Sequence, residues 1–262
     1  MLIKIALVQH RIGEPVGLDL KLHLFRKQPD FVCFPEYWGA AAPLRDQRAL
    51  AQEEAFGRAV MARLSGNLSC TVIGGTVVSS GSDGRLYNEA PVSRKGLTLG
   101  SYRKMHPTAR ERDSGIEPGN RASTFEVEGL RVGVAICADC LEAATFDRYW
   151  EEAVDLIFVP NASPHRPGET AQEKLRRDQD IFVRGAVRSG AYIIKVCGVG
   201  SLFGSRLQGR SLVVAPWGIL HCVPPEEEHR AQVITVNLST DELHEFRNRF
   251  AGRRATAGLP KG

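Results

Sequence analysis

The feature that most constrains the fold is a series of short apolar runs, rich in Val, Ile and Leu, separated by helical patterns or turns. We predict strands at residues 3–9, 31–34, 71–79, 90–93, 97–102, 131–137, 155–160, 192–199, 211–215, 218–222 and 232–237. Several runs are apolar at successive positions, which is typical of strands that are covered on both faces. The pattern therefore predicts buried sheets flanked by helices, that is, an α/β fold.

Helical spacing marks three of the intervening stretches. In residues 44–65 the apolar face consists of Phe56, Ala59, Val60 and Leu64. In residues 169–189 an apolar stripe of Leu175, Phe182 and Ala186 opposes a charged face of Glu173, Lys174, Arg176, Arg177 and Asp178. A third helix is expected from just after Cys140 to about residue 153.

Two further segments lack either periodicity. Residues 104–120 are charged and end in Pro-Gly, so we expect a long loop, and such loops in compact domains often carry function. Residues 251–262 combine charges with Gly and Pro, which predicts a flexible C-terminal tail. The remaining residues, 1–250, are expected to form a single domain.

Composition and charge exclude several classes of protein. Of 262 residues, 43% are hydrophobic and 24% are charged, which excludes collagen-like and wholly disordered chains. The 34 basic and 30 acidic residues are interspersed, so nucleic acid is not an expected partner. No apolar run approaches the roughly 18 residues of a membrane span, and no signal peptide is recognisable. We therefore expect a soluble, cytoplasmic protein whose six cysteines are reduced.

One cysteine stands where an apolar strand gives way to a polar stretch. Cys137 ends the run R-V-G-V-A-I-C and is followed by A-D-C-L-E, a pattern that predicts a turn into a helix. A helix N-terminus favours the thiolate, which is the nucleophilic form of cysteine. The backbone N–H of the next residue, Ala138, can face a developing oxyanion. Cys137 is therefore a candidate nucleophile, and a buried structural cysteine is the alternative interpretation.

Cys137 and Cys140 also form a C-x-x-C pair, which suggests redox or zinc chemistry. Zinc would need two further ligands, and the sequence has no second C-x-x-C or H-x₃₋₅-H pair. A thioredoxin-like fold is much shorter and has fewer strands than this chain. A thiol-redox protein stays an alternative, and its test is whether Cys140 is essential.

Two other predicted strands are followed by residues that could take part in catalysis with Cys137, a glutamate and a lysine. Glu36 follows the apolar run that ends at Phe34 and lies among aromatic residues, so partial desolvation would raise its pKa toward that of a general base. Lys104 follows another strand, and its charge would stabilise a thiolate or an oxyanion. The simpler interpretation of Glu36 is a carboxylate at a helix end, and that of Lys104 is a surface lysine.

The order of glutamate, lysine and cysteine along the chain resembles the nitrilase (carbon–nitrogen hydrolase) superfamily over nearly the whole length. That family uses Glu, Lys and Cys in this order, which the resemblance places at Glu36, Lys104 and Cys137. The segments that carry it are I-A-L-V-Q (5–9), F-P-E (34–36), Y-N-E-A (87–90), Y-R-K-M-H (102–106), G-V-A-I-C-A-D (133–139), N-A-S-P (161–164) and A-P-W-G (215–218).

A further acid is implied by K-M-H-P-T-A-R-E-R (104–112), which resembles K-x-x-P-T-x-x-E-R of the nitrilase branch. It places the family's additional active-site glutamate at Glu111, where the alternative is a solvated loop charge. The resemblance implies a four-layer α-β-β-α sandwich, a small-molecule amide, carbamoyl or nitrile substrate, no metal or organic cofactor, and a homodimer or larger homo-oligomer.

Departures from the family pattern bear on the substrate. The nitrilase branch has W-E after its nucleophile, whereas this chain has Ala138 and Asp139, which is closer to the amidase and carbamoylase branches. The R-F-P-E continuation of those branches is absent, and Arg188 and Ala215 replace residues common in the family. We therefore expect a hydrolase of amides or N-carbamoyl compounds. A nitrilase and a non-catalytic binding protein of the same fold are the remaining alternatives.

Overall fold

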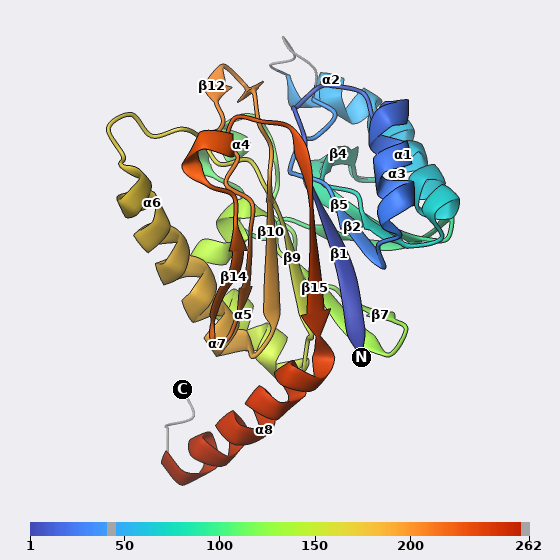
Figure 1. The fold of residues 1–262 in the computed structure, drawn as a ribbon. Helices are drawn as coiled ribbons and strands as arrows, with labels where there is room; N and C mark the ends of the chain where they lie inside the picture. Colours follow the sequence, from blue (N-terminus) through green and yellow to red (C-terminus); the bar gives the residue numbers. More distant parts are fainter. Residues whose placement is uncertain (41–45, 258–262) are drawn as a thin grey trace.

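The computed structural model describes the chain at residues 1–40 and 46–257, with side chains up to Phe250. Two sheets stack face to face, and helices cover the outer face of each (Figure 1). The first sheet has seven strands in the order β15-β1-β2-β3-β5-β4, with β6 also paired to β5. Its strands are β1 (Leu2–Gln9), β2 (Phe31–Cys33), β3 (Thr71–Ile73), β4 (Val77–Ser80), β5 (Leu86–Arg94), β6 (Leu97–Arg103) and β15 (Gln232–Ser239).

The second sheet has six strands in the order β14-β13-β10-β9-β8-β7. They are β7 (Thr124–Val127), β8 (Leu130–Val134), β9 (Leu156–Asn161), β10 (Tyr192–Cys197), β13 (Leu212–Ala215) and β14 (Gly218–Cys222). A separate short hairpin, β11 (Ser201–Leu202) with β12 (Ser205–Arg206), lies beside the upper end of the sheets in Figure 1. The central strands β8, β9 and β10 are parallel, so their carboxyl ends meet at one edge.

Alternating side chains of the strands build three apolar layers. In β1, Ile5 packs between the sheets, whereas Ala6 packs under the helices of the first sheet. In β9, Phe158 packs between the sheets and Ile157 under the helices of the second sheet. Three apolar layers between four layers of secondary structure define an α-β-β-α sandwich, which confirms the predicted fold class.

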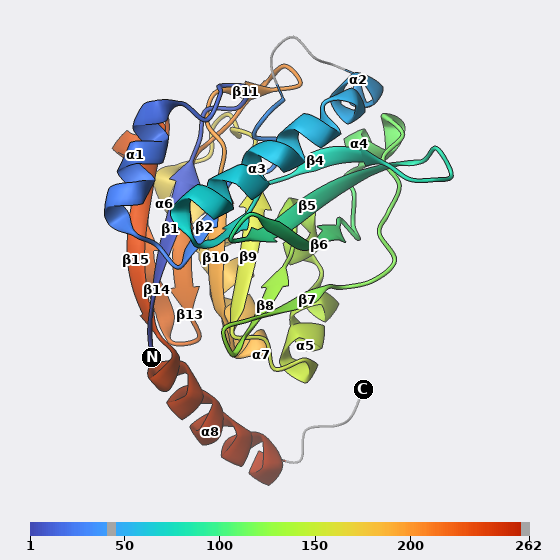
Figure 2. The same cartoon turned by 90° about the vertical axis from the view of Figure 1, so that its right-hand side faces the viewer.

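Helices cover the outer faces of both sheets (Figure 2). On the first sheet these are α1 (Leu18–Lys27) and α3 (Glu54–Leu68), with the short α2 (Gln47–Gln52) above them. On the second sheet they are α5 (Ala143–Glu151), α6 (Ala171–Asp178), the π-helical turn η2 (Gln179–Val183) and α7 (Arg184–Ser189). Apolar side chains of α3, α5, η2 and α7 pack against the strands. Short helices α4 (Ala109–Asp113), η1 (Cys137–Leu141) and η3 (Pro225–Glu227) lie in loops.

The C-terminal helix α8 (Thr240–Ala257) projects away from the sandwich (Figure 1). It includes the first residues of the predicted tail, and residues 258–262 lie outside the described part, so a flexible tail at 251–262 stays a prediction. Within the described residues, no helix is long and apolar enough to span a bilayer.

The predicted strands match the observed ones closely, with one division. Residues 71–79 form two strands, β3 and β4, because Gly74 and Gly75 interrupt the run. Gly75 has a φ of +62°, and a Cβ atom there would lie 2.2 Å from the carbonyl oxygen of Pro35. Only glycine fits this close approach, which brings the end of β3 against the turn after β2.

The predicted helices need larger corrections. The helix predicted at 44–65 is divided into α2 and α3, and its first two residues lie outside the described part. Leu64 packs in the core as expected, but Phe56, expected in the same apolar face, is 65% exposed, because α3 turns Met61 toward the core beside Leu64. The loop predicted at 104–120 contains α4. The apolar pattern also gave no indication of α1, β7, the β11–β12 hairpin and α8.

The helix predicted at 169–189 is interrupted by η2. A π-helical turn accommodates an extra residue, and it rotates the preceding helical segment relative to the next one. Lys174 and Asp178, expected on the solvent-exposed face, are buried, because they precede the buried Phe182 by eight and four residues and so lie on its side of the helical segment.

Candidate active site

Cys137 lies in the turn that leads from β8 into η1. Its φ is +46°, in the left-handed region that side chains rarely adopt. Such backbone strain persists only where surrounding contacts hold it, and it is common at functional positions. The residue therefore stands at a fixed turn beyond the end of a buried parallel strand.

Asp139 supplies the contacts that hold this turn. Its buried carboxylate accepts a hydrogen bond from the backbone N–H of Ile136 at 2.8 Å, which closes the turn around Cys137. It also accepts bonds from the Tyr102 hydroxyl at 2.8 Å and the His106 backbone N–H at 2.7 Å. Because Tyr102 and His106 flank Lys104, Asp139 fixes the cysteine turn relative to the lysine.

Glu36 extends from the turn after β2 into the same region. Tyr37, the next residue, has a φ of +55° and donates its backbone N–H to Thr76 at 2.8 Å. The buried carboxylate of Glu36 accepts hydrogen bonds from Asn88 Nδ2 at 2.9 Å and from the backbone N–H of Ala162 at 3.1 Å. The Glu36 carboxylate is thus held by β5 of the first sheet and by the residue that follows β9 of the second sheet.

Lys104 lies between two carboxylates. Its Nζ is 2.7 Å from Glu36 Oε1 and 2.7 Å from Glu111 Oε2, and all three side chains are buried. Asn88 bridges the same carboxylates, since its Nδ2 also donates to Glu111 Oε1 at 2.8 Å. The Tyr37 hydroxyl donates to Glu111 Oε1 at 2.9 Å. The lysine is therefore held at one position by a closed network.

Glu111 is positioned by the start of α4. Its carboxylate accepts from the Thr108 backbone N–H at 2.8 Å, while the Thr108 hydroxyl accepts from the Glu111 N–H at 3.3 Å, which together form a capping box. The residue pattern T-x-x-E is a known signal of a helix start. This signal was available in the sequence and would have predicted α4.

The charges of this network move the pKa values of the two carboxyl groups apart. Burial raises the pKa of Glu36, and Lys104 only partly offsets this effect. Burial acts in the same direction on Glu111, but Lys104 and the hydrogen bonds from Thr108 and Asn88 outweigh it and lower its pKa. Burial would lower the pKa of Lys104, yet Glu36, Cys137 and Glu111 raise it above its usual value. Glu36 is thus the group most ready to take up a proton.

The surroundings of Cys137 disfavour the thiolate form of its thiol. Its pKa is raised, mainly by burial and then by the negative charge of Glu36, while Lys104 acts to lower it. The sequence indicates that a helix start favours the thiolate, but η1 has only five residues, and burial and the charge of Glu36 outweigh the effects that favour the thiolate. A base must remove the proton as the sulfur reacts.

Two adjoining cavities reach Cys137. One, of about 280 Å³, is lined by Glu36, Lys104 and Glu111 together with Phe203 and Leu207. The other, of about 240 Å³, lies on the opposite side of Thr108 and Pro164 and includes Ala138. Cys137 thus borders both cavities.

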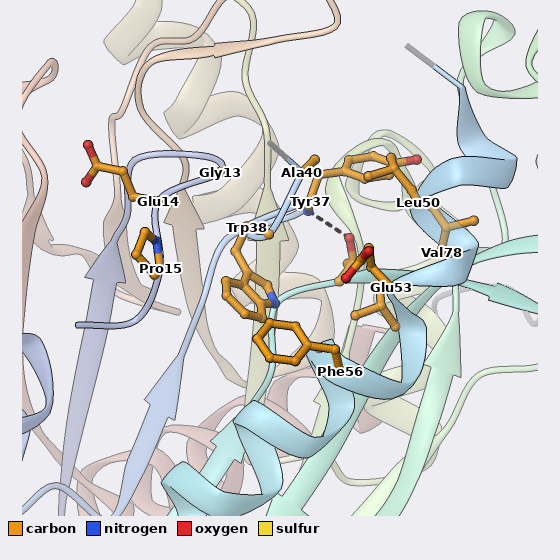
Figure 3. A pocket seen from close by; sticks show the side chains of 14 residues that line it. Gly13, Glu14, Pro15, Tyr37, Trp38, Ala40, Leu50, Glu53, Phe56 and Val78 are labelled. Atoms are coloured by element: carbon orange, nitrogen blue, oxygen red, sulfur yellow. Dashed lines mark hydrogen bonds between the residues drawn. The ribbon is translucent and has the colours of Figure 1, made fainter. Parts of the chain in front are cut away.

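A third hollow, of about 300 Å³, lies on the other side of Tyr37 and contains none of these groups (Figure 3). Trp38, Leu50 and Phe56 make it largely apolar, and the ionisable groups among its described lining residues are Tyr37, Glu14 and Glu53. These described residues give the hollow the shape to hold an apolar group, and they include neither a cysteine nor a basic side chain.

The structure brings together all four ionisable residues that the sequence singled out, Glu36, Lys104, Glu111 and Cys137. Ala138 follows the cysteine and is half-buried at the second cavity. Sequence reasoning assigned no role to Asn88, although Y-N-E-A contains it, and missed Tyr37 and Asp139 as partners. Cys140 is buried against the helices of the second sheet and lines the second cavity together with Cys137.

The sequence profile of the carbon-nitrogen hydrolase family matches residues 6–248. The chain belongs to this family. Among solved structures, a carbon-nitrogen hydrolase from Helicobacter pylori G27 has a TM-score of 0.83 at 17% identity, covering 97% of this chain and 94% of that one. A mutant amidase from Nesterenkonia sp. AN1, with acrylamide added at its active-site cysteine, has a TM-score of 0.75 at 19% identity, covering 96% and 99%.

Two curated relatives show the range of the family. A glutamine-dependent NAD(+) synthetase of Xanthomonas campestris is 29% identical over 210 residues, 74% of this chain and 35% of that protein. An omega-amidase of Xenopus tropicalis is 29% identical over 196 residues, 70% of this chain and 66% of that protein. Each match thus spans less than two thirds of the relative.

Proposed function

We propose that this protein hydrolyses the C–N bond of an amide or N-carbamoyl compound through a covalent intermediate on Cys137. The observation that carries the proposal is the ammonium group of Lys104, held 2.7 Å from both Glu36 and Glu111 beside a cysteine that borders two cavities. The network contains a base, a fixed cation and a nucleophile within one buried site.

In the first half of the reaction, ionised Glu36 takes the thiol proton while Sγ of Cys137 bonds to the carbonyl carbon. The carbonyl electron pair moves to oxygen, where Lys104 Nζ and the Ala138 backbone N–H stabilise the negative charge. The C–N bond then breaks, and Glu36 gives its proton to the departing nitrogen. Ammonia or an amine leaves, and a thioester remains on the cysteine.

In the second half, Glu36 takes a proton from water as the water oxygen adds to the thioester carbon. The C–S bond breaks, the sulfur regains its proton from Glu36, and the acid is released. Every proton removed by Glu36 is returned within the cycle. The raised pKa of Glu36 suits both tasks, because a base with a pKa near the working pH also serves as an acid.

Glu111 and Asn88 are positioning residues in this scheme. The lowered pKa of Glu111 keeps it ionised, so it holds the Lys104 ammonium without competing for the proton that Glu36 carries. Asn88 fixes the separation of the two carboxylates by donating to both. In enzymes, two carboxyl groups commonly take different catalytic roles when their surroundings give them different pKa values.

An amide or carbamoyl group is proposed rather than a nitrile. Support comes from Ala138 and Asp139 after the nucleophile, and from the relatives described as amidases. An amide develops negative charge on oxygen, whereas a nitrile gives a thioimidate whose nitrogen must be protonated twice before ammonia leaves. Lys104 and the Ala138 N–H are donors of the kind that an oxyanion requires.

Parallel assays of matched compounds test the proposal. Ammonia release is measured with propionamide, N-carbamoylglycine and propionitrile, and we expect a higher kcat/KM for the amide or the carbamoyl compound than for the nitrile. A higher kcat/KM for the nitrile would make the enzyme a nitrilase. The cytoplasmic location and the homodimer or larger oligomer expected from the sequence are retained as parts of this proposal.

The charge of Glu111 gives a pH-dependent prediction. Ionised Glu36 is the active form, so kcat/KM should fall as pH decreases through the raised pKa of Glu36, above the usual range for glutamate. The Glu111 charge contributes to that raised pKa. Glu111→Gln should therefore move the acidic limb of the pH profile to lower pH, while glutamine can keep the capping box.

The matched control is Glu126→Gln, which removes the same charge from an exposed strand residue and should leave the profile in place. An acidic limb that stays unchanged or moves to higher pH in Glu111→Gln would contradict the assignment of Glu36 as the base.

A further inference from the structure

Three charged side chains outside this mechanism are buried next to Cys137. Lys174 and Asp178 on α6 and Lys195 on β10 are 1%, 2% and 1% exposed. Charged residues are seldom buried this deeply unless they are paired or bind something. None of the three touches Glu36, Lys104 or Glu111 through a hydrogen bond or ion pair in the described part of the chain.

The pairing within this cluster is incomplete. Lys195 Nζ donates to Asp178 Oδ1 at 2.8 Å. Lys174 Nζ is 3.6 Å from the same oxygen, and it donates to the Ser163 hydroxyl at 3.3 Å. Asp178 Oδ2 is buried and has no hydrogen-bond partner among the described residues. Two cations therefore share one anion, which leaves one positive charge and one acceptor oxygen unmatched.

These residues line the second cavity that reaches Cys137. Among the described residues that line it, Asp178 is the only carboxylate, whereas four carry a basic group: Arg166, Lys174, Arg177 and Lys195. Arg177 is paired with Glu169 at 2.7 Å. At roughly 30 Å³ per water, the cavity of about 240 Å³ has room for about eight water-sized groups. It suits a short chain that ends in an anion.

We propose that this cavity binds the carboxylate of an amide substrate, with Lys174 as the residue that recognises it. The proposal rests on the proposed function, since the amide carbon would lie at Cys137 while the acyl chain extends past Ala138. One bound carboxylate would neutralise the residual charge of the cluster. The free oxygen of Asp178 would accept a hydrogen bond from a donor group beside that carboxylate.

The ionisation of Lys174 supports this role, and it makes the recognition of a carboxylate depend on pH. Its pKa is lowered to about 8, mainly by burial and then by the charge of Lys195, against the opposing charge of Asp178. The other ionisable groups facing it are Arg177 on its own helix, Cys197 on β10 and Arg166 on the cavity wall. The ammonium form is present below about pH 8 and is lost above it.

The test compares each anionic amide with a neutral compound of the same shape. The pairs are succinamate with 4-methylpentanamide, and glutaramate with 5-methylhexanamide, in which an isopropyl group replaces the carboxylate. At pH 7 we expect kcat/KM to favour the anionic member by about 30-fold or more, as for a buried charge contact. Both members of a pair depend equally on the ionisation of the catalytic groups, so that dependence cancels in the ratio of their kcat/KM values. The ratio should fall as pH rises through about 8, where Lys174 loses its charge.

Lys174→Met should remove most of this preference while ammonia release from the neutral amides continues. Lys174→Arg, which keeps the charge, should retain a preference. Arg176→Met, an exposed position on the same helix, is the control for net charge. Equal losses for anionic and neutral amides in Lys174→Met, or no preference in the unaltered enzyme, would overturn the proposal.

Binding of glutarate, measured by calorimetry, separates this inference from the proposed function. If no amide is hydrolysed but glutarate binds the unaltered protein and not Lys174→Met, the subsite stands and the proposed reaction is wrong. If amides are hydrolysed with Cys137 required but glutarate binding does not depend on Lys174, the reaction stands and the subsite is wrong.

Discussion

Replacing Cys137 with alanine should reduce kcat for the preferred amide by about 10⁶-fold, the scale on which loss of a covalent nucleophile acts in a hydrolase. The sulfur is the only part of the site that forms a bond with substrate carbon in the proposed reaction. Alanine keeps the turn, because Asp139 holds it through the backbone of Ile136 rather than through the thiol. Ammonia release and thermal unfolding of the two proteins are the measurements.

Cys140→Ala is the matched control. Cys140 is 4% exposed, packs under the helices of the second sheet and lines the second cavity, but it forms no bond in the proposed reaction. Cys140→Ala should therefore lower stability and can weaken substrate binding, while kcat falls far less than in Cys137→Ala. A thiol-redox protein that uses the C-x-x-C pair would instead require both cysteines. Substantial ammonia release by Cys137→Ala, or loss of activity in Cys140→Ala without unfolding, would contradict the assignment.

Replacing Lys104 with methionine should have the second largest effect. Loss of one oxyanion donor costs about 10²–10³ in kcat, and the thiol pKa should rise further because Lys104 acts to lower it. The change also leaves Glu36 and Glu111 facing each other without their cation. Breaking a buried pair in this way costs about 3–5 kcal/mol of unfolding free energy, so one carboxyl group should take up a proton.

Three measurements check this prediction: the rate of ammonia release, the rate of thiol alkylation by iodoacetamide, and the unfolding midpoint. Lys95→Met, at an exposed turn position, is the control for loss of a positive charge. Near-normal turnover and alkylation in Lys104→Met would show that the lysine is structural and that the charge on the oxyanion is stabilised elsewhere.

Buried sheets flanked by helices were predictable from the residues because both sheets are buried on two faces, whereas the four-layer order was implied by the family resemblance. Strands such as β9 and β10 are buried along their whole length and mostly apolar, apart from Asn161 and Lys195, so they stand out from the helical segments. Helix α1 was missed because Leu24 is its one buried side chain, which leaves no apolar stripe in the sequence. The division at Gly75 depends on a contact with Pro35 that only the folded chain reveals.

The catalytic candidates were accessible to sequence reasoning because Glu36, Lys104 and Cys137 each follow a strand end. Their partners were harder to find. Asn88 lies within β5, and nothing in its local pattern indicates that its side chain bridges two carboxylates. Lys174 and Asp178 stand among other charged residues in the sequence, so their residue types do not indicate that they are buried on the same side of the helical segment as Phe182.

The most direct test of the central claim is the intact mass of the protein during turnover. With a preferred amide, rapid acid quenching and mass spectrometry should show an added acyl group, and peptide mapping should place it on Cys137. Cys137→Ala should show no such adduct, and Cys140→Ala should show it unchanged. An enzyme that releases ammonia at full rate without ever carrying an acyl group on Cys137 would contradict the account.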